Sequence, residues 1–155
     1  MAEYRKTEVL KQYSPVNEGV IDRLLNEEIN KSQTKFVVLD DDPTGIQTVH
    51  DISVFTDWSK ASMRKGFIDE NRLFYILTNS RSMTPEQTRQ VHEEIARTAE
   101  EISRELNQKY VLISRSDSTL RGHYPLETNV LKEVMEKQGG HSVDGEILCF
   151  FFKEG

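Results

Sequence analysis

Short apolar runs alternate with longer helical patterns along most of the chain. The runs are Phe36–Leu39, Ile52–Phe55, Leu73–Leu77, Tyr110–Ile113 and Glu146–Phe152, and each has the length and composition of a buried strand. Apolar strands that alternate with amphipathic helices are typical of a mainly parallel sheet covered on both faces. The pattern therefore predicts an α/β fold, a Rossmann-like three-layer domain.

The clearest helical pattern begins at Thr84–Pro85–Glu86–Gln87, which has the form of a capping box with proline at the first helical position. Apolar residues then recur at helical spacing as far as Leu106, and they predict one buried face. His92 falls on the other side of this helix, so we expect it to be exposed. Three further helices are predicted from Ser14–Pro15 onward, over Trp58–Gly66, and over Pro125–Met135.

Composition narrows the class of protein. The chain has 155 residues, of which 36% are hydrophobic and 30% charged, and its formal net charge is −6. That charge argues against non-specific nucleic-acid binding, which needs a basic face. No apolar run approaches the ~20 residues of a membrane helix. Cys149 is the single cysteine, so no intramolecular disulfide can form, and we expect a buried thiol in a cytoplasmic protein. A homo-oligomer is an open alternative to a monomer.

Three predicted strands run directly into polar clusters. These clusters are Asp40–Gly45, Asn79–Arg81 and Ser114–His123. Because the carboxyl ends of parallel strands lie on one edge of a sheet, we expect the three clusters to share one crevice. This convergence is the strongest functional signal in the residues themselves.

Each cluster has a structural and a functional interpretation. The aspartates after Leu39 can simply form a turn. Alternatively, they can accept hydrogen bonds from ligand hydroxyl groups, act as a general base or hold Mg²⁺ through water. Arg81 can pair with helix-start acids, or it can belong to the site. The third cluster can be a capped turn with a solvated Arg121, or an anion- and hydroxyl-binding site at the start of a helix. For His123 the two interpretations are equally weighted.

Two motif resemblances follow from these clusters. Asp40-x-Asp42-x-Thr44, followed by Leu77–Thr78–Asn79, resembles the first two motifs of haloacid dehalogenase-like phosphatases. That resemblance implies a nucleophilic Asp40, an acid/base Asp42 and Mg²⁺. It leaves the Ser114–His123 cluster unexplained, and the late acidic pair of that family is not visible in the chain.

The motif D-D-P-T-G at Asp41–Gly45, together with S-R-S-D-S-T-L-R-G at Ser114–Gly122, resembles the four-carbon acid sugar kinase family. The resemblance implies an ATP-dependent kinase of threonate, erythronate or 3-oxo-tetronate. It extends over residues 36–155, with 1–35 as an N-terminal helical extension. It also implies that 36–155 is part of a substrate-binding domain, that a C-terminal nucleotide-binding domain with ATP and Mg²⁺ is absent here, and that this segment alone is inactive.

The same resemblance implies roles for individual residues. Asp42 and Asp117 are the candidate catalytic residues, and the choice of general base between them stays open. The implied substrate-binding residues are Asp41, Thr44, Gly45, Ser80, Arg81, Arg115, Ser118, Thr119, Arg121, Gly122 and His123. No metal ligands are assigned, and no Walker A or G-x-G-x-x-G motif is found. A non-catalytic sugar-acid-binding fragment is the remaining alternative.

Overall fold

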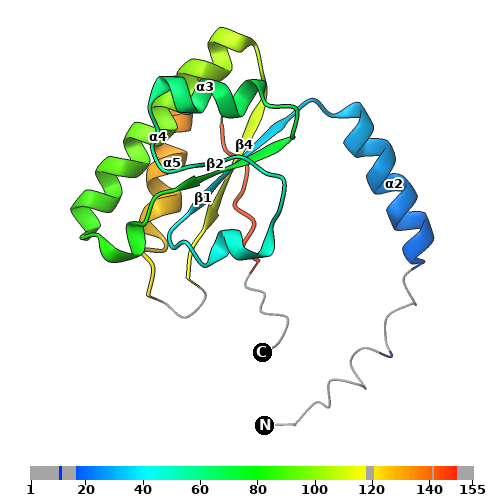
Figure 1. Cartoon of the computed structure of the whole chain (residues 1–155), viewed down its shortest axis with the longest axis horizontal. Coiled ribbons are helices and arrows are strands. Elements are labelled where there is room, and N and C mark those ends of the chain that lie inside the picture. The colour runs from blue at the N-terminus through cyan, green and yellow to red at the C-terminus, as the bar shows by residue number, and fades with distance from the viewer. Residues whose placement is uncertain (1–10, 12–16, 118–120, 141, 150–155) are drawn as a thin grey trace. The chain divides into compact units, whose positions relative to one another are not determined.

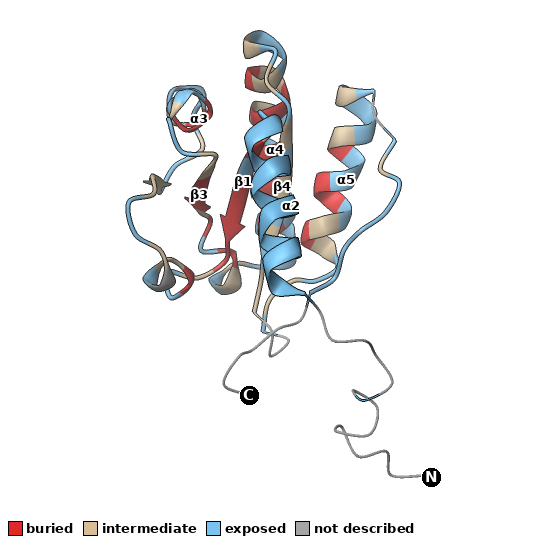
Figure 2. Ribbon diagram, turned by 90° about the vertical axis from the view of Figure 1, so that its right-hand side faces the viewer, coloured by how far each residue is buried: buried red, intermediate tan, exposed pale blue. Residues whose placement is uncertain are grey.

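The computed structural model describes residues 11, 17–117, 121–140 and 142–149. Contacts divide the chain into two compact units, Met1–Gln33 and Thr34–Gly155. In the first unit, α2 spans Glu18–Lys31, with the Asn17 side chain accepting the Val20 N–H at 3.2 Å. No residue of α2 is buried (Figure 2). The helix start predicted at Ser14–Pro15 lies outside the described residues.

The second unit contains a parallel sheet. Its strands are β1 (Lys35–Asp40), β2 (Val54–Phe55), β3 (Leu73–Leu77) and β4 (Tyr110–Arg115). They lie in the order β2-β3-β1-β4, and every pair is parallel (Figure 1). This arrangement confirms the predicted α/β class and is consistent with a three-layer α/β fold.

Three helices of this unit connect or follow the strands: α3 (Lys60–Ile68), α4 (Pro85–Leu106) and α5 (Leu126–Gly139). Two short 3₁₀ turns, η1 (Gly45–Thr48) and η2 (Ser80–Ser82), follow β1 and β3. The predicted capping box of α4 is present, because Thr84 Oγ1 accepts the Gln87 N–H and the Gln87 side chain accepts the Thr84 N–H. The cap satisfies backbone donors that the first helical turn leaves unpaired.

The core lies on one face of the sheet. Val37 and Leu39 of β1 point to this face together with Phe74 and Ile76 of β3, and all four are buried. Figure 2 shows buried stretches in both strands. The helices cover them with Met63, Phe67, Ile95, Ala96, Ala99, Ile102, Leu131 and Val134. A Cβ on Gly66 would lie 2.5 Å from the Phe74 ring, so glycine allows α3 to approach β3 closely.

The opposite face of the sheet is apolar as well. Val38 is buried there, whereas Phe36, Val111 and Ile113 are 37%, 43% and 42% exposed. Strands that are apolar on both sides are expected for the middle layer of a three-layer α/β fold.

The end of the described chain differs from the prediction. Glu146–Cys149 form no strand, and Ile147 is 94% exposed, while Phe150–Phe152 lie outside the described residues. An apolar run becomes a strand only where a neighbour pairs with its backbone groups, and the described residues provide none here. Cys149 is exposed rather than buried, which corrects the expectation from its apolar neighbours. Over the residues described, no helix is both long and apolar enough to span a bilayer.

Candidate active site at the carboxyl edge of the sheet

The carboxyl ends of β1, β3 and β4 lie level with one another. Asp40 is in register with Leu77 on one side and with Arg115 on the other. Backbone hydrogen bonds continue this pairing past the strand ends, from Asp41 N to Arg115 O at 3.2 Å and from Arg81 N to Asp41 O at 3.3 Å. The parallel topology therefore brings together residues from the three predicted clusters.

Arg81 is at the centre of the cluster. Its guanidinium binds Asp41 side-on, with Nη2 2.9 Å from Oδ1 and Nε 3.3 Å from Oδ2. Its Nη1 lies 3.1 Å from Asp42 Oδ2 and 3.2 Å from Asp117 Oδ2. One guanidinium thus neutralises carboxylates from two different strand ends, and the hydrogen bonds that Arg81 donates to Asp41 raise the pKa of Arg81.

Asp117 joins the third cluster to the first. Its backbone N–H donates to Asp41 Oδ2 at 3.1 Å, and its Oδ2 lies 2.6 Å from Arg121 Nη2. The Asp117 side chain is 3% exposed, whereas that of Arg121 is 68% exposed. Arg121 is therefore the cation of this cluster that solvent reaches most easily.

A second ion pair lies at the end of β1. Arg115 Nη1 contacts Asp40 Oδ1 at 3.1 Å, and Asp40 is completely buried. Burial raises the pKa of Asp40, and the adjacent Arg115 partly opposes that rise. A Cβ on Gly45 would lie 1.8 Å from Arg115 Nη1 and 1.9 Å from Asp40 Oδ2, so this ion pair requires glycine at position 45.

Gly122 has a similar place beside Asp41. A Cβ on Gly122 would lie 2.0 Å from Ser116 Oγ and 3.3 Å from Asp41 Oδ2. Glycine therefore allows the turn before α5 to pack directly onto the aspartates. Ser116 Oγ is buried, and none of the residues described forms a hydrogen bond with it.

Asp42 is the most open carboxylate of the group. Its side chain is 23% exposed, against 3% for Asp41 and for Asp117. Hydrogen bonds from Thr44, including N–H to Oδ1 at 2.8 Å, lower the pKa of Asp42. Asp42 is therefore ionised at neutral pH and able to accept a hydrogen bond from a ligand.

The other predicted site residues take different positions. His123 Nε2 bonds the Met83 carbonyl at 3.0 Å, which fixes its ring beside the start of α4. Ser80 is completely buried, and its hydroxyl donates to Glu127 Oε1 at 2.9 Å. Ser80 thus lies behind the cluster, with its hydroxyl bound to Glu127. Ser118 and Thr119 lie outside the described residues.

Sequence reasoning missed two buried polar residues near the cluster. His92 is 1% exposed, where exposure was expected, and Glu127 is also 1% exposed. A signal for both exists in the helical spacing. His92 lies three residues before the buried Ile95, and Glu127 lies four residues before the buried Leu131, so each belongs to its helix's inner face.

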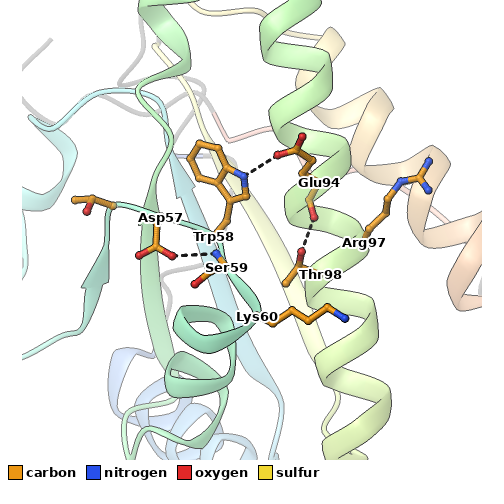
Figure 3. A pocket seen from close by; sticks show the side chains of 8 residues that line it. Asp57, Trp58, Ser59, Lys60, Glu94, Arg97 and Thr98 are labelled. Carbon is orange, nitrogen blue, oxygen red and sulfur yellow. Dashed lines mark hydrogen bonds between the residues drawn. The ribbon is translucent and has the colours of Figure 1, made fainter.

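A surface pocket of ≈ 520 Å³ lies elsewhere, between the loop after β2 and the middle of α4 (Figure 3). It is lined by Thr56, Asp57, Trp58, Ser59, Lys60, Glu94, Arg97 and Thr98. The Trp58 ring N–H donates to Glu94 Oε2 at 3.0 Å, and Thr98 bonds the Glu94 carbonyl (Figure 3). No residue of the strand-end cluster lines this pocket, and its polar groups largely bond one another.

The carboxylates of the described residues are not grouped as metal ligands. Over these residues, no group of three or more His, Cys, Asp or Glu side chains is arranged to hold a metal ion. The aspartates at the strand ends instead face arginines. The arrangement suits a small ligand with hydroxyl groups and one anionic group, for which it offers carboxylate acceptors and the exposed Arg121.

The fold and the cluster together define an α/β domain with a polar site at the carboxyl edge of a parallel sheet, where such folds bind ligands. A family model described as "Sugar-binding N-terminal domain" matches residues 36–155, and the chain belongs to this family. This membership indicates a sugar as the ligand. Searches of curated proteins and of solved structures gave no significant match.

Proposed function

We propose that this chain binds a four-carbon sugar acid of threonate, erythronate or 3-oxo-tetronate type, as the acceptor-binding part of an ATP-dependent kinase. The observation that carries the proposal is the Arg81-centred cluster, which gathers Asp41, Asp42 and Asp117 beside the exposed Arg121. The hydroxyl groups of a sugar acid can donate hydrogen bonds to the aspartates, and its carboxylate can pair with Arg121. The sugar-binding family and the motif Asp117–Gly122 support this class of ligand.

Arg121 is the proposed partner of the substrate carboxylate. A guanidinium can bind a carboxylate with two parallel hydrogen bonds. Arg81 is less suited to this role, because its side chain is 22% exposed and already bound to Asp41, Asp42 and Asp117. In the proposal Arg81 keeps the carboxylates close together, and Arg121 exchanges part of its contact with Asp117 for the ligand.

Asp42 is the proposed general base. It is the more exposed of the two candidates, so a substrate hydroxyl can reach it more easily than it can reach Asp117. As an ionised carboxylate it can orient that hydroxyl and accept its proton as the bond to phosphorus forms. Asp117, which is nearly buried, then positions the two arginines.

The phosphate donor enters the proposal only as a second substrate. ATP with Mg²⁺ would supply the phosphoryl group, and in the proposal it binds residues other than those described here. The contribution of this chain is then to hold the acceptor hydroxyl in a fixed orientation, which is a large part of catalysis in phosphoryl transfer. The proposed setting is the cytoplasm.

The phosphatase alternative finds less support in the geometry. It requires Asp40 as a nucleophile, but Asp40 is completely buried and paired with Arg115 at 3.1 Å. A nucleophile must be open to the phosphoester. Phosphatase turnover that Asp40→Asn abolishes would restore this alternative.

Calorimetric titration of this chain with threonate, erythronate and 3-oxo-tetronate tests the ligand class. We expect at least one of them to bind, and Arg121→Ala to weaken that binding roughly 10- to 100-fold, because a charged hydrogen-bonded pair is lost. Arg97→Ala is the matched control, since Arg97 is also exposed and also pairs with a carboxylate four residues away. No binding by any of the three acids would contradict the proposal.

Kinase activity is tested separately, on the full-length protein that contains this chain. Asp42→Asn should lower kcat by about 100-fold or more while KM changes little, because a general base acts mainly in the transition state. Sugar-acid binding without any ATP-dependent phosphorylation by the full-length protein would support the non-catalytic alternative instead.

A further inference from the structure

A row of buried polar side chains lies directly behind Arg81. Ser80 is completely buried, and Glu127 and His92 are each 1% exposed. They come from η2, α5 and α4, so three separate elements contribute to the row. The proposed ligand contacts do not use any of these side chains.

The contacts within this row are specific. Ser80 Oγ donates to Glu127 Oε1 at 2.9 Å, and His92 Nε2 lies 3.8 Å from the same oxygen. His92 Nδ1 lies 2.8 Å from the Thr88 carbonyl, which can only accept, so the proton is on Nδ1. Among the described residues, none forms a hydrogen bond with Glu127 Oε2.

Such a row is costly if its only role is to fill space. A buried carboxylate loses its hydration, and apolar residues of similar volume often stabilise a core as well or better. A role beyond packing is therefore needed to explain Glu127 among the buried Val130, Leu131 and Val134 of α5.

The row is attached to the turn that presents Arg81. That turn begins at Asn79, whose φ of 55° is left-handed, and continues as the 3₁₀ turn Ser80–Ser82. Ser80 is its only buried residue. The Ser80–Glu127 hydrogen bond therefore ties the turn to α5, one residue before the arginine that collects the aspartates.

We infer that Glu127 is a positioning residue for the proposed sugar-acid site: Glu127 holds Ser80, and the held turn aims Arg81 at Asp41, Asp42 and Asp117. The significance of this for ligand binding rests on the proposed function. The aim of Arg81 itself can be measured without any ligand.

The test uses three variants of this chain. Ser80→Ala removes the donor to Glu127. Glu127→Leu removes the acceptor. The double variant removes both, so it leaves no unpaired Ser80–Glu127 partner and should recover much of the stability that Ser80→Ala loses. Ser82→Ala is the matched control, because Ser82 is in the same turn but is exposed and bonds the Asn79 carbonyl.

The first readout is the ¹⁵N–¹H signal of Arg81 Nε, which donates to Asp41 Oδ2. We expect this signal to be slow-exchanging in the wild type and in Ser82→Ala, and to be lost or shifted in all three other variants. The second readout is sugar-acid affinity, which should fall roughly tenfold in the double variant.

The double variant separates positioning from folding. If its free energy of unfolding equals that of the wild type and it keeps the wild-type Arg81 Nε signal, the inference is overturned. If the wild type binds no sugar acid but the signal still depends on Ser80 and Glu127, the proposed function fails and the positioning inference survives. A wild type that binds the ligand, with affinity unchanged in the double variant, overturns the inference alone.

Discussion

The ion pair between Asp40 and Arg115 depends on glycine at position 45, where a side chain would collide with both residues. Its two residues are 75 positions apart in the chain, and Gly45 packs against both. Arg115 can move its flexible end away from an added methyl group, but Asp40 is short and completely buried. The strain of a larger residue at position 45 therefore falls mainly on Asp40.

Gly45→Ala should lower the free energy of unfolding by about 1–3 kcal/mol, the usual effect of overpacking at a well-packed position. Urea denaturation followed by circular dichroism measures this change. Gly145→Ala is the control, because a Cβ there meets nothing within 4 Å. Equal stability of the two variants would show that the Asp40–Arg115 pair is not held against Gly45.

His92 should make stability depend on pH. Burial lowers the pKa of His92 below its unfolded value of 6.5, although the Thr88 carbonyl, Glu127 and Asp41 favour the charged ring, and His123 opposes it. As pH falls below about 6.5, the unfolded chain therefore takes up a proton that the folded chain resists. Stability from this group is complete above that pH and is lost below it.

Unfolding free energies measured between about pH 7.5 and 5 should therefore fall with pH, by at most about 1.4 kcal/mol per unit for one proton. His92→Asn should flatten this dependence, since asparagine does not titrate and can still donate to the Thr88 carbonyl. A wild-type slope in His92→Asn would assign the effect to another group.

At the scale of elements, local signals predicted some parts of the fold well. β3 and α4 have the predicted bounds, because turn residues and a capping box mark them in the sequence. Features of the fold that depend on residues far away in the sequence could not be predicted from local patterns. β4 continues to Arg115 because Asp40 pairs with it across the sheet. The burial of His92, by contrast, has a local signal in its helical spacing to Ile95, and only its partner Glu127 on α5 lies far away in the sequence.

The capping box of α4 offers a test at this scale. Thr84→Ala should cost about 0.5–2 kcal/mol of unfolding free energy, the usual range for the loss of an N-cap side chain. Thr98→Ala, within the same helix, should be neutral or slightly stabilising, since its hydroxyl only bonds the Glu94 carbonyl one turn away. Similar losses in both variants, measured by urea denaturation, would mean that the box does not stabilise α4.

At the scale of the whole molecule, the site exists because parallel strands end on one edge. The sequence predicted this convergence from the order of elements alone. It did not predict which carboxylate Arg81 would bind, since Asp41, Asp42 and Asp117 reach it through loops whose geometry no periodicity encodes. The class of fold thus fixes where the site is, and the packing of glycines and buried polar residues fixes its form.

All described residues of the cluster and of the core belong to the unit Thr34–Gly155. A chain that lacks Met1–Gln33 should therefore fold cooperatively and bind the sugar acid with an affinity within about twofold of the complete chain, a difference of less than 0.5 kcal/mol. Thermal unfolding by circular dichroism and calorimetric titration measure the two properties. Arg121→Ala in the shortened chain is the control, and it should weaken binding as much as it does in the complete chain. Loss of binding with folding intact would contradict this prediction.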